Sequence, residues 1–212
     1  MRIYQDKYLS VTSIIELREP FNKESFSKWC LSNGLDESLV ASTSRVLGEK
    51  VSEYLNDVSN GLRGTTAPQI DMLEGRLYSA IDNFLKEWEL VSTEKEVVCE
   101  ELGYAGRYDG IIRRKGTHDI LLVDWKTFGA WKKGSYKRDS KKIKHATWQL
   151  SLYANALEWS SGLGVVIFKN NGTWELERVK FDSEMIEWVS KNQSLILEVI
   201  ENEKNKKTLV EV

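Results

Sequence analysis

The chain has 212 residues, of which 41% are hydrophobic and 29% are charged, and its formal net charge is -2 at pH 7. These values predict an ordinary globular protein with one domain over residues 1–212 and exclude an overall basic surface, so any nucleic-acid signal has to be local. The two cysteines, Cys30 and Cys99, exclude a disulfide framework and a four-cysteine metal site within one chain.

The amino-terminal 90 residues are predicted to be mainly helical. The start, MRIYQDKYLSVTS, lacks the basic flank and apolar stretch of a signal peptide, and no apolar run approaches the roughly 18–20 residues of a membrane span. We therefore expect a soluble, cytoplasmic chain without a membrane partner. Apolar residues recur at three- and four-residue steps over 46–55 and 73–88, which predicts two helices with a polar loop over 59–69 between them.

Strand patterns replace the helical pattern from about residue 93. EKEVVCEEL, YAGRYDGIIRR and DILLVDWKTF predict a three-stranded meander over 94–102, 104–114 and 119–128. A helix over 146–160, a hairpin of strands 164–170 and 173–181 around Asn171-Gly172, and one amphipathic helix over 183–204 complete the order. The sequence thus predicts a mixed α/β (α+β) domain with one central sheet, in which a helical portion (1–90) precedes an αβ core (91–200).

Two carboxylates and an amine lie at the ends of the second and third predicted strands. Period-two geometry places Asp124 and Lys126 on one face of their strand, and Asp109 on the preceding strand can lie beside them. Converging carboxylates repel each other, and Lys126 supplies only one compensating charge. A hard divalent cation, Mg²⁺ or Mn²⁺, would complete the balance, and these parts together suit phosphodiester hydrolysis. Spacing alone leaves open a pair of strand-end residues in ordinary salt bridges.

The same stretch resembles motifs II and III of the PD-(D/E)XK nuclease superfamily, in particular its RecB-like and phage-exonuclease branch. The matching segments are AGRYDG and LVDWKT. The resemblance implies the restriction-endonuclease-like core, which is a central mixed sheet flanked by helices. It also implies that Asp109, Asp124 and the backbone carbonyl of Trp125 hold Mg²⁺ or Mn²⁺, and that Lys126 is the catalytic lysine.

A second segment, QLSLY, is similar to the Gln-x-x-x-Tyr motif that the branch carries on the helix after the lysine strand. Gln149 and Tyr153 lie four residues apart, so they share one helical face. We expect both to contact DNA phosphates or the site carboxylates. A surface glutamine beside a half-buried tyrosine is the alternative for this pair taken alone.

The amino-terminal half resembles the branch more faintly. YLSVTSIIE is similar to the Ser-Val-Thr-x-Ile/Leu opening of phage-type members, and RVLGEKVSEYL to their first-motif helix. That helix commonly carries a metal-binding histidine four residues after its glycine, where this chain has Ser52. Fewer protein ligands with more water, substitution by Glu49 or Glu53, or weakened activity would each account for the departure. On the strand before AGRYDG only one of Glu100 and Glu101 can face the site, and the family pattern favours Glu100 as a further ligand.

A strongly basic stretch, FGAWKKGSYKRDSKKIKH, lies between the lysine strand and the helix of Gln149. We expect a loop over 131–144 that guides a DNA strand, because lysines bind phosphates and aromatic rings stack on unpaired bases. The candidate DNA-binding residues in it are Trp131, Lys132, Lys133, Tyr136, Lys137, Arg138, Lys141, Lys142 and Lys144. A solvated loop is the alternative, and His118 and His145 are interpreted as incidental.

Together with the resemblance, these motifs predict a metal-dependent deoxyribonuclease. By family it would be an exonuclease that acts on DNA ends or single strands in DNA repair, recombination or phage DNA processing. Two alternatives stay open. One is a DNA-binding module of the same fold whose metal site is weakened by Ser52. The other is a protein-interaction domain in which the basic loop contacts an acidic partner.

Overall fold

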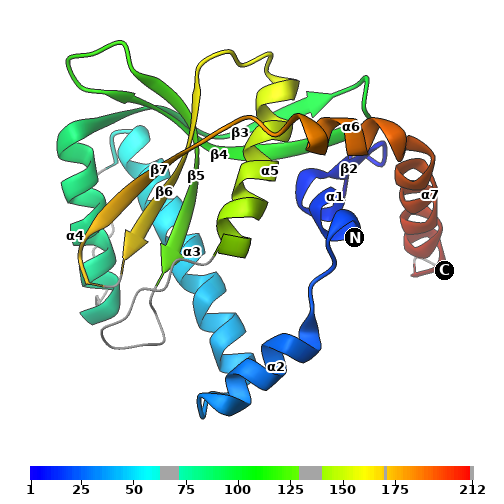
Figure 1. Ribbon diagram of the computed structural model, residues 1–212, viewed down its shortest axis with the longest axis horizontal. Coiled ribbons are helices and arrows are strands. Elements are labelled where there is room, and N and C mark those ends of the chain that lie inside the picture. Colours follow the sequence, from blue (N-terminus) through cyan, green and yellow to red (C-terminus); the bar gives the residue numbers. More distant parts are fainter. Residues whose placement is uncertain (63–71, 129–139, 170, 211–212) are drawn as a thin grey trace.

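A seven-stranded sheet runs through the computed structural model, which describes residues 1–62, 72–128, 140–169 and 171–210 (Figure 1). The strands are β1 (Ile3–Tyr4), β2 (Tyr8–Ser10), β3 (Trp88–Cys99), β4 (Tyr104–Arg114), β5 (Ile120–Phe128), β6 (Gly162–Lys169) and β7 (Trp174–Val179). The helices are α1 (Val11–Arg18), α2 (Lys23–Ser32), α3 (Glu37–Ser59), α4 (Met72–Glu87), α5 (Ser140–Ala156), α6 (Ser183–Lys191) and α7 (Gln193–Val210). This architecture confirms the predicted mixed α+β class with one central sheet flanked by helices.

The strand order is β1-β2-β4-β5-β6-β7, and β3 also pairs with β4. β3, β4 and β5 form the predicted antiparallel meander. α5 connects β5 to the parallel strand β6, and β7 returns antiparallel after the turn that contains Asn171 and Gly172. β2 lies parallel to the first two residues of β4, so β4 has β2 and β5 at different points along one side.

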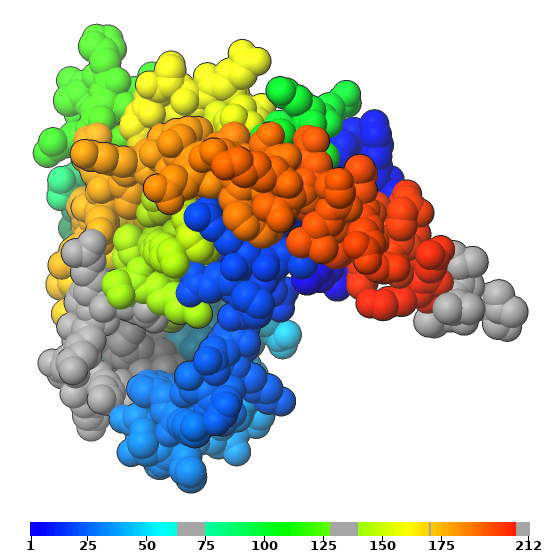
Figure 2. All heavy atoms as spheres, turned by 45° about the vertical axis from the view of Figure 1, so that its right-hand side comes forward, coloured from blue at the N-terminus to red at the C-terminus, as the bar shows by residue number. Residues whose placement is uncertain are grey.

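Different helices cover the two faces of the sheet (Figure 1). On one face, α3 and α4 pack through Leu55 and Phe84 in a cluster that includes Trp125 of β5. On the other face, α1, α5 and α6 cover a second cluster that includes Leu122 of β5 and Leu152 of α5. α2 packs on α3 and projects from the body of the molecule (Figure 2). Because neighbouring residues of β5 face opposite clusters, the strand is held from both sides.

The amino-terminal region contains two short strands, β1 and β2, that the sequence did not indicate. They are too short to show an alternating pattern, and they form because β2 pairs with β4. α3 begins well before residue 46, because Asp36 caps it by accepting a hydrogen bond from Leu39 N at 2.8 Å. β3 begins at Trp88, which the helical periodicity had included in the preceding helix. Trp88 pairs with Arg114 of β4 and is buried in the core cluster, and these tertiary contacts override the local helical pattern.

Two later elements also differ from the prediction. α5 begins at Ser140, so residues 140–144 are helical and the expectation of a loop through 144 is wrong for them. The single closing helix expected over 183–204 is divided into α6 and α7 at Asn192. The N–H of Asn192 donates to the carbonyls of Trp188 and Val189, while its own carbonyl accepts from Ile196 N. Asn192 therefore ends one helix and begins the next.

Within the described ranges, no helix combines the length and the apolar character needed to cross a membrane.

Phe84 is the centre of the aromatic packing between α4 and the sheet. Its ring centroid lies 5.3 Å from that of Trp174, 5.7 Å from Phe168, 6.0 Å from Trp125 and 6.4 Å from Trp88. We expect Phe84→Ala to lower the free energy of unfolding by about 3–5 kcal/mol, because it removes buried apolar surface and leaves a cavity. Urea denaturation followed by tryptophan fluorescence measures the change.

Phe21→Ala is the matched control, since the side chain of Phe21 is 62% exposed. It should change the free energy of unfolding by less than about 0.5 kcal/mol. Equal losses in the two variants would contradict the central role of Phe84.

Candidate functional site

β4 and β5 separate just before the acidic residues. Their backbone pairing ends at the pair Gly110–Val123. Beyond it, Trp125 N–H donates to Asp109 Oδ2 at 2.8 Å, where a continuing ladder would use a backbone carbonyl. β5 stays paired with β6 past this point, whereas β4 continues toward β2. Beyond this point β4 and β5 are no longer joined by backbone hydrogen bonds, and the side chain of Asp109 lies between them.

Asp124 and Lys126 lie on the face of β5 opposite Val123 and Trp125, in agreement with the period-two pattern. Lys126 Nζ is 2.5 Å from Asp124 Oδ2. The Asp124 side chain is only 2% exposed, and apart from this ion pair the described residues give neither of its oxygens a hydrogen bond. The structure thus brings Asp109, Asp124 and Lys126 together.

Burial makes the two carboxylates difficult to ionise. Burial first, and then the charge of Asp124, raise the pKa of Asp109 to about 7, although Lys126 and Trp125 N–H oppose this. Burial also raises the pKa of Asp124 against the effect of Lys126. Burial by itself would lower the pKa of Lys126, but the two carboxylates outweigh it and raise that pKa. The lysine therefore keeps its charge, and the ionised trio carries an excess negative charge.

A cavity of about 470 Å³ opens in front of Asp109. α3, α5, the start of α1 and the strands β3 and β4 contribute to its wall. The lining residues that bear on its chemistry are Ser52, Glu53, Glu94, Arg107, Gln149 and Tyr153. Asp109 is also in the lining, whereas Asp124, which is buried, and Lys126 are not. The cavity therefore gives a ligand access to the acidic site at Asp109.

Gln149 and Tyr153 reach this cavity from α5. Gln149 Nε2 donates to the hydroxyl of Tyr153 at 3.4 Å. Tyr153 packs directly on Gly106, where a Cβ atom would lie 2.7 Å from the ring, so glycine is needed for this close approach. Burial is the main cause of a raised pKa for Tyr153, and the charges of Asp109 and Asp124 add to it. The hydroxyl therefore stays protonated and can donate a hydrogen bond.

Glu94 is the acidic residue of β3 beside Asp109, and it is not among the site residues predicted from the sequence. In the β3–β4 register it falls between the two pairs that flank Asp109. Its backbone is left-handed, with φ 52°, and its carboxylate lies 2.6 Å from Arg107 Nε. Counting across the tight turn of residues 100–103 would have identified it, because antiparallel partners around a turn have a constant sum of residue numbers.

Glu100 lies away from the cavity, contrary to the expectation that it faces the site. It follows the last residue of β3, and Tyr8 OH donates to its Oε1 at 3.5 Å. The reason is the antiparallel register, in which residues of β3 after Glu94 run away from Asp109. Ser52 and Glu53 of α3, in contrast, both line the cavity, so the position of the missing histidine is at the site. A metal-binding role for Glu53 stays a prediction.

The candidate DNA-binding residues divide into two groups. Lys141 and Lys144 lie at the start of α5 and contact Glu19 at 3.2 Å and 2.8 Å, on the side of this helix toward α1. His145 Nε2 is 3.3 Å from the same carboxylate, and Lys142 is exposed. The other candidates lie outside the described residues: Trp131, Lys132, Lys133, Tyr136, Lys137 and Arg138.

The donor set at the site fits a hard divalent cation. Asp124 has two buried oxygens whose partner is one ammonium, and Asp109 lies beside it. The N–H and carbonyl of a strand residue point to the same edge, so the Trp125 carbonyl points to the side of Asp109. Among the side chains that the structure describes, no group of three or more acidic, histidine or cysteine residues could hold a metal ion. Water and substrate oxygens would supply the other ligands, as Mg²⁺ commonly accepts.

Asp109→Asn is expected to raise the thermal midpoint in EDTA at pH 8 by about 5 °C. Asparagine keeps an oxygen for Trp125 N–H but removes a charge that burial disfavours. The folded-state pKa of Asp109 is raised to about 7 from 3.8, so between these values the folded protein binds a proton that the unfolded chain does not. Stability from this group therefore increases as the pH falls through that window, and the advantage of asparagine should shrink from pH 8 to pH 5. Differential scanning fluorimetry measures the midpoints.

Asp57→Asn removes the same charge from α3 outside the cavity and serves as the control. Its midpoint should stay within about 2 °C of the wild type at every pH. A midpoint of Asp109→Asn below the wild type at pH 8 would mean that the ionised carboxylate stabilises the fold.

Comparison with known proteins gives one family. A family model of the PD-(D/E)XK nuclease superfamily matches residues 31–205. A search of curated proteins finds no significant match. A candidate exonuclease from Eubacterium rectale is 14% identical and has a TM-score of 0.56, with 96% of this chain and 88% of that chain covered.

Two further solved structures have lower TM-scores. LHK-Exo, solved in complex with dAMP, is 14% identical with a TM-score of 0.46, and the match covers 97% of this chain and 94% of that chain. SSO0001 is 18% identical with a TM-score of 0.43, over 92% and 78% of the two chains. At these identities the structural likeness concerns the fold. The family match is different in kind, because it includes every element from α3 to α6 and with them the whole acidic site. The chain therefore belongs to the PD-(D/E)XK nuclease superfamily.

Proposed function

We propose that this protein is a metal-dependent deoxyribonuclease that acts as an exonuclease on DNA ends or single strands. The observation that carries the proposal is the buried Asp124–Lys126 ion pair beside Asp109, in a chain of a nuclease superfamily. The fold shared with the Eubacterium rectale candidate exonuclease supports the exonuclease mode. Such an enzyme would serve DNA repair, recombination or phage DNA processing. Both packed clusters lie against one sheet, which supports a single domain over residues 1–212.

The proposal gives each acidic-site residue one role. Asp109, Asp124 and the carbonyl of Trp125 would hold Mg²⁺ or Mn²⁺. When bound, such an ion polarises a phosphoryl oxygen and lowers the pKa of a bound water. Lys126, held charged by its two carboxylates, would orient the attacking water or offset the charge that develops on the phosphate.

The residues of α5 would contact the DNA backbone. The protonated hydroxyl of Tyr153 and the amide of Gln149 can donate to phosphate oxygens at the cavity. Lys142 lies seven residues before Gln149, about two helical turns, and so shares its side of α5. The basic segment over 131–144 would guide the strand to this side of the helix.

A second candidate function rests on Ser52. This residue lines the cavity where the family commonly has a metal-binding histidine, so the ion would be held by one protein ligand fewer. In that case the protein binds DNA through the same surface but cleaves it slowly or not at all.

A gel assay of end-labelled linear DNA and closed circular DNA tests the activity. We expect loss of linear DNA, single- or double-stranded, with Mg²⁺ or Mn²⁺ and none with EDTA. Lys126→Ala should reduce the rate at least about 100-fold, because the charge that faces the reacting phosphate is removed. Survival of the circles would support the exonuclease mode. Absence of cleavage together with a DNA shift on a native gel would favour the binding module.

Metal binding is expected to stabilise the fold by mass action. Mg²⁺ or Mn²⁺ at ten times its Kd should raise the thermal midpoint by about 3–6 °C, since it binds only the folded carboxylate pair. Asp124→Asn should abolish most of this rise, whereas Asp57→Asn should keep it. If Asp124→Asn kept the full rise, the ion would bind elsewhere.

A further inference from the structure

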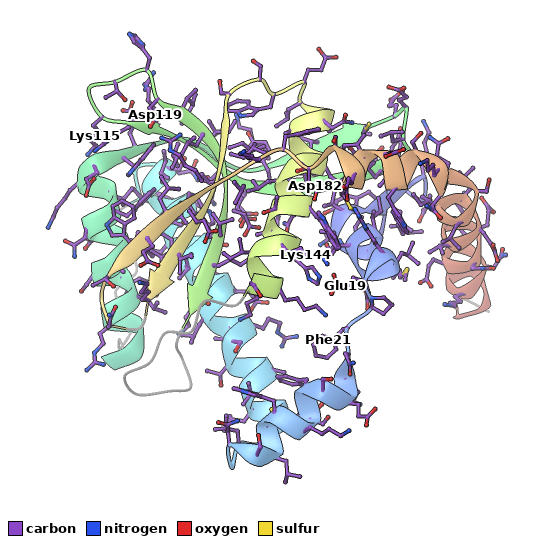
Figure 3. The ribbon with its side chains drawn as sticks, viewed as in Figure 1. Glu19, Phe21, Lys115, Asp119, Lys144 and Asp182 are labelled. Atoms are coloured by element: carbon purple, nitrogen blue, oxygen red, sulfur yellow. The ribbon has the colours of Figure 1, made fainter. Side chains whose placement is uncertain are left out.

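Glu19 lies outside the acidic site, in the linker between α1 and α2, and cationic side chains of α5 surround it. Lys144 Nζ is 2.8 Å from its Oε2 and Lys141 Nζ is 3.2 Å from its Oε1. His145 Nε2 is 3.3 Å from Oε2. Figure 3 shows Lys144 and Glu19 near each other at the end of α5 where that helix starts. Two ammonium groups of one helix thus hold the carboxylate, and the imidazole of His145 lies beside it without a hydrogen-bond partner among the described residues.

The donor arrangement suits a phosphate as well as it suits a carboxylate. Lys141, Lys144 and His145 have the spacing i, i+3 and i+4, so they lie on one helical face and converge on one anion. Ammonium donors form charge-assisted hydrogen bonds to either anion. The side chain of Glu19 is 30% exposed, and those of Lys141 and Lys144 are 46% and 52% exposed. A phosphate from solution can therefore reach the ammonium groups of Lys141 and Lys144 that Glu19 contacts.

The cluster also lies next to the proposed DNA path. His145 precedes Gln149 by four residues, which is about one helical turn and about 6 Å along the helix axis. On its other side a cavity of about 440 Å³ has Arg18, Lys144 and Trp148 in its wall. The guanidinium of Arg18 and the ammonium of Lys144 lie 4.3 Å and 4.5 Å from the centroid of the Trp148 ring. Asp182 and Glu184 form another part of this wall, so a phosphate would stay on the side of α5.

We propose that Lys141, Lys144 and His145 form a second DNA-phosphate site, and that Glu19 occupies it as an internal competitor until a DNA strand displaces the carboxylate. The proposal rests on the proposed deoxyribonuclease function and adds a contact about one helical turn from Gln149. In this proposal Glu19 lowers the affinity for DNA, because its carboxylate competes with a DNA phosphate for the same lysines. If the cluster only stabilised the contact between the α1–α2 linker and α5, removal of the Glu19 charge would lower the stability of the fold. The affinity for DNA would then be unchanged or lower.

Fluorescence anisotropy with a labelled single-stranded DNA 20-mer measures how strongly Glu19 lowers the affinity for DNA. All proteins carry Lys126→Ala to prevent cleavage and are titrated with Mg²⁺ present at several KCl concentrations. One more phosphate contact on a single strand changes the salt slope by about 0.7, which corresponds to about 5-fold in affinity at 0.1 M salt. We therefore expect Glu19→Gln to bind about 5-fold more tightly than its parent and with a steeper salt dependence.

Glu187→Gln is the matched control, because Glu187 forms a comparable pair with Lys191, at 2.5 Å, on α6. It should leave DNA affinity unchanged. If Glu187→Gln increased the DNA affinity as much as Glu19→Gln, the change in net charge would explain both gains, and the proposal would be overturned. Unchanged or weaker binding by Glu19→Gln would overturn it as well, with thermal unfolding used to check that the variant is folded.

Lys144→Ala tests the site independently of whether Glu19→Gln folds. In the parent, where Glu19 neutralises the lysine, the loss of affinity should be about 2-fold or less, whereas in the Glu19→Gln background it should approach 5-fold. If Lys144→Ala lowered the DNA affinity equally in the two backgrounds, the proposal that Glu19 competes with DNA would be overturned. If neither the parent nor the Glu19→Gln variant bound DNA, the proposed function would be overturned too. If the parent bound DNA and the Glu19→Gln variant bound it no more tightly, only this inference would be overturned.

Discussion

The separation of β4 from β5 is the constraint on which the candidate site depends. Where the ladder ends, Trp125 N–H donates to the side chain of Asp109 and so fixes that carboxylate. The ring of Trp125 packs on Gly110, where a Cβ atom would lie only 2.5 Å from it, and on Phe84 of α4 at 6.0 Å between centroids. The aromatic core on one face of the sheet therefore positions the backbone group that orients an acidic residue at the cavity.

Electrostatics at the site oppose stability and favour ligand binding. Burial raises the pKa values of both Asp109 and Asp124, and one lysine compensates for one of the two charges. An apolar core of the same volume would cost less free energy, so structural needs alone do not account for the arrangement, and the proposed cation site agrees with it. Lys126 forms an ion pair with Asp124, and the charges of both carboxylates raise its pKa.

α5 connects the acidic site with the rest of the proposed DNA surface. Gln149 and Tyr153 face the cavity in front of Asp109, whereas Lys144 faces Glu19 in the linker that leads to α2. Because both sets of contacts belong to one helix that packs against the sheet, a strand bound at one would be aligned with the other. Contact with Glu19 also ties the start of α5 to the segment from which α2 projects.

The sequence by itself determined the parts of the site that depend on local geometry. Strand alternation places Asp124 and Lys126 on one face, and four-residue spacing places Gln149 and Tyr153 together, so both pairs could be predicted. The tertiary structure decided the parts that depend on pairing between distant segments. The β3–β4 register brings Glu94, and not Glu100, to Asp109. The contact of α5 with Glu19 likewise joins residues 125 positions apart in the sequence, and the pairing of β2 with β4 joins residues about 95 positions apart. No local pattern encodes such contacts, because their stability comes from packing that exists only once the chain has folded.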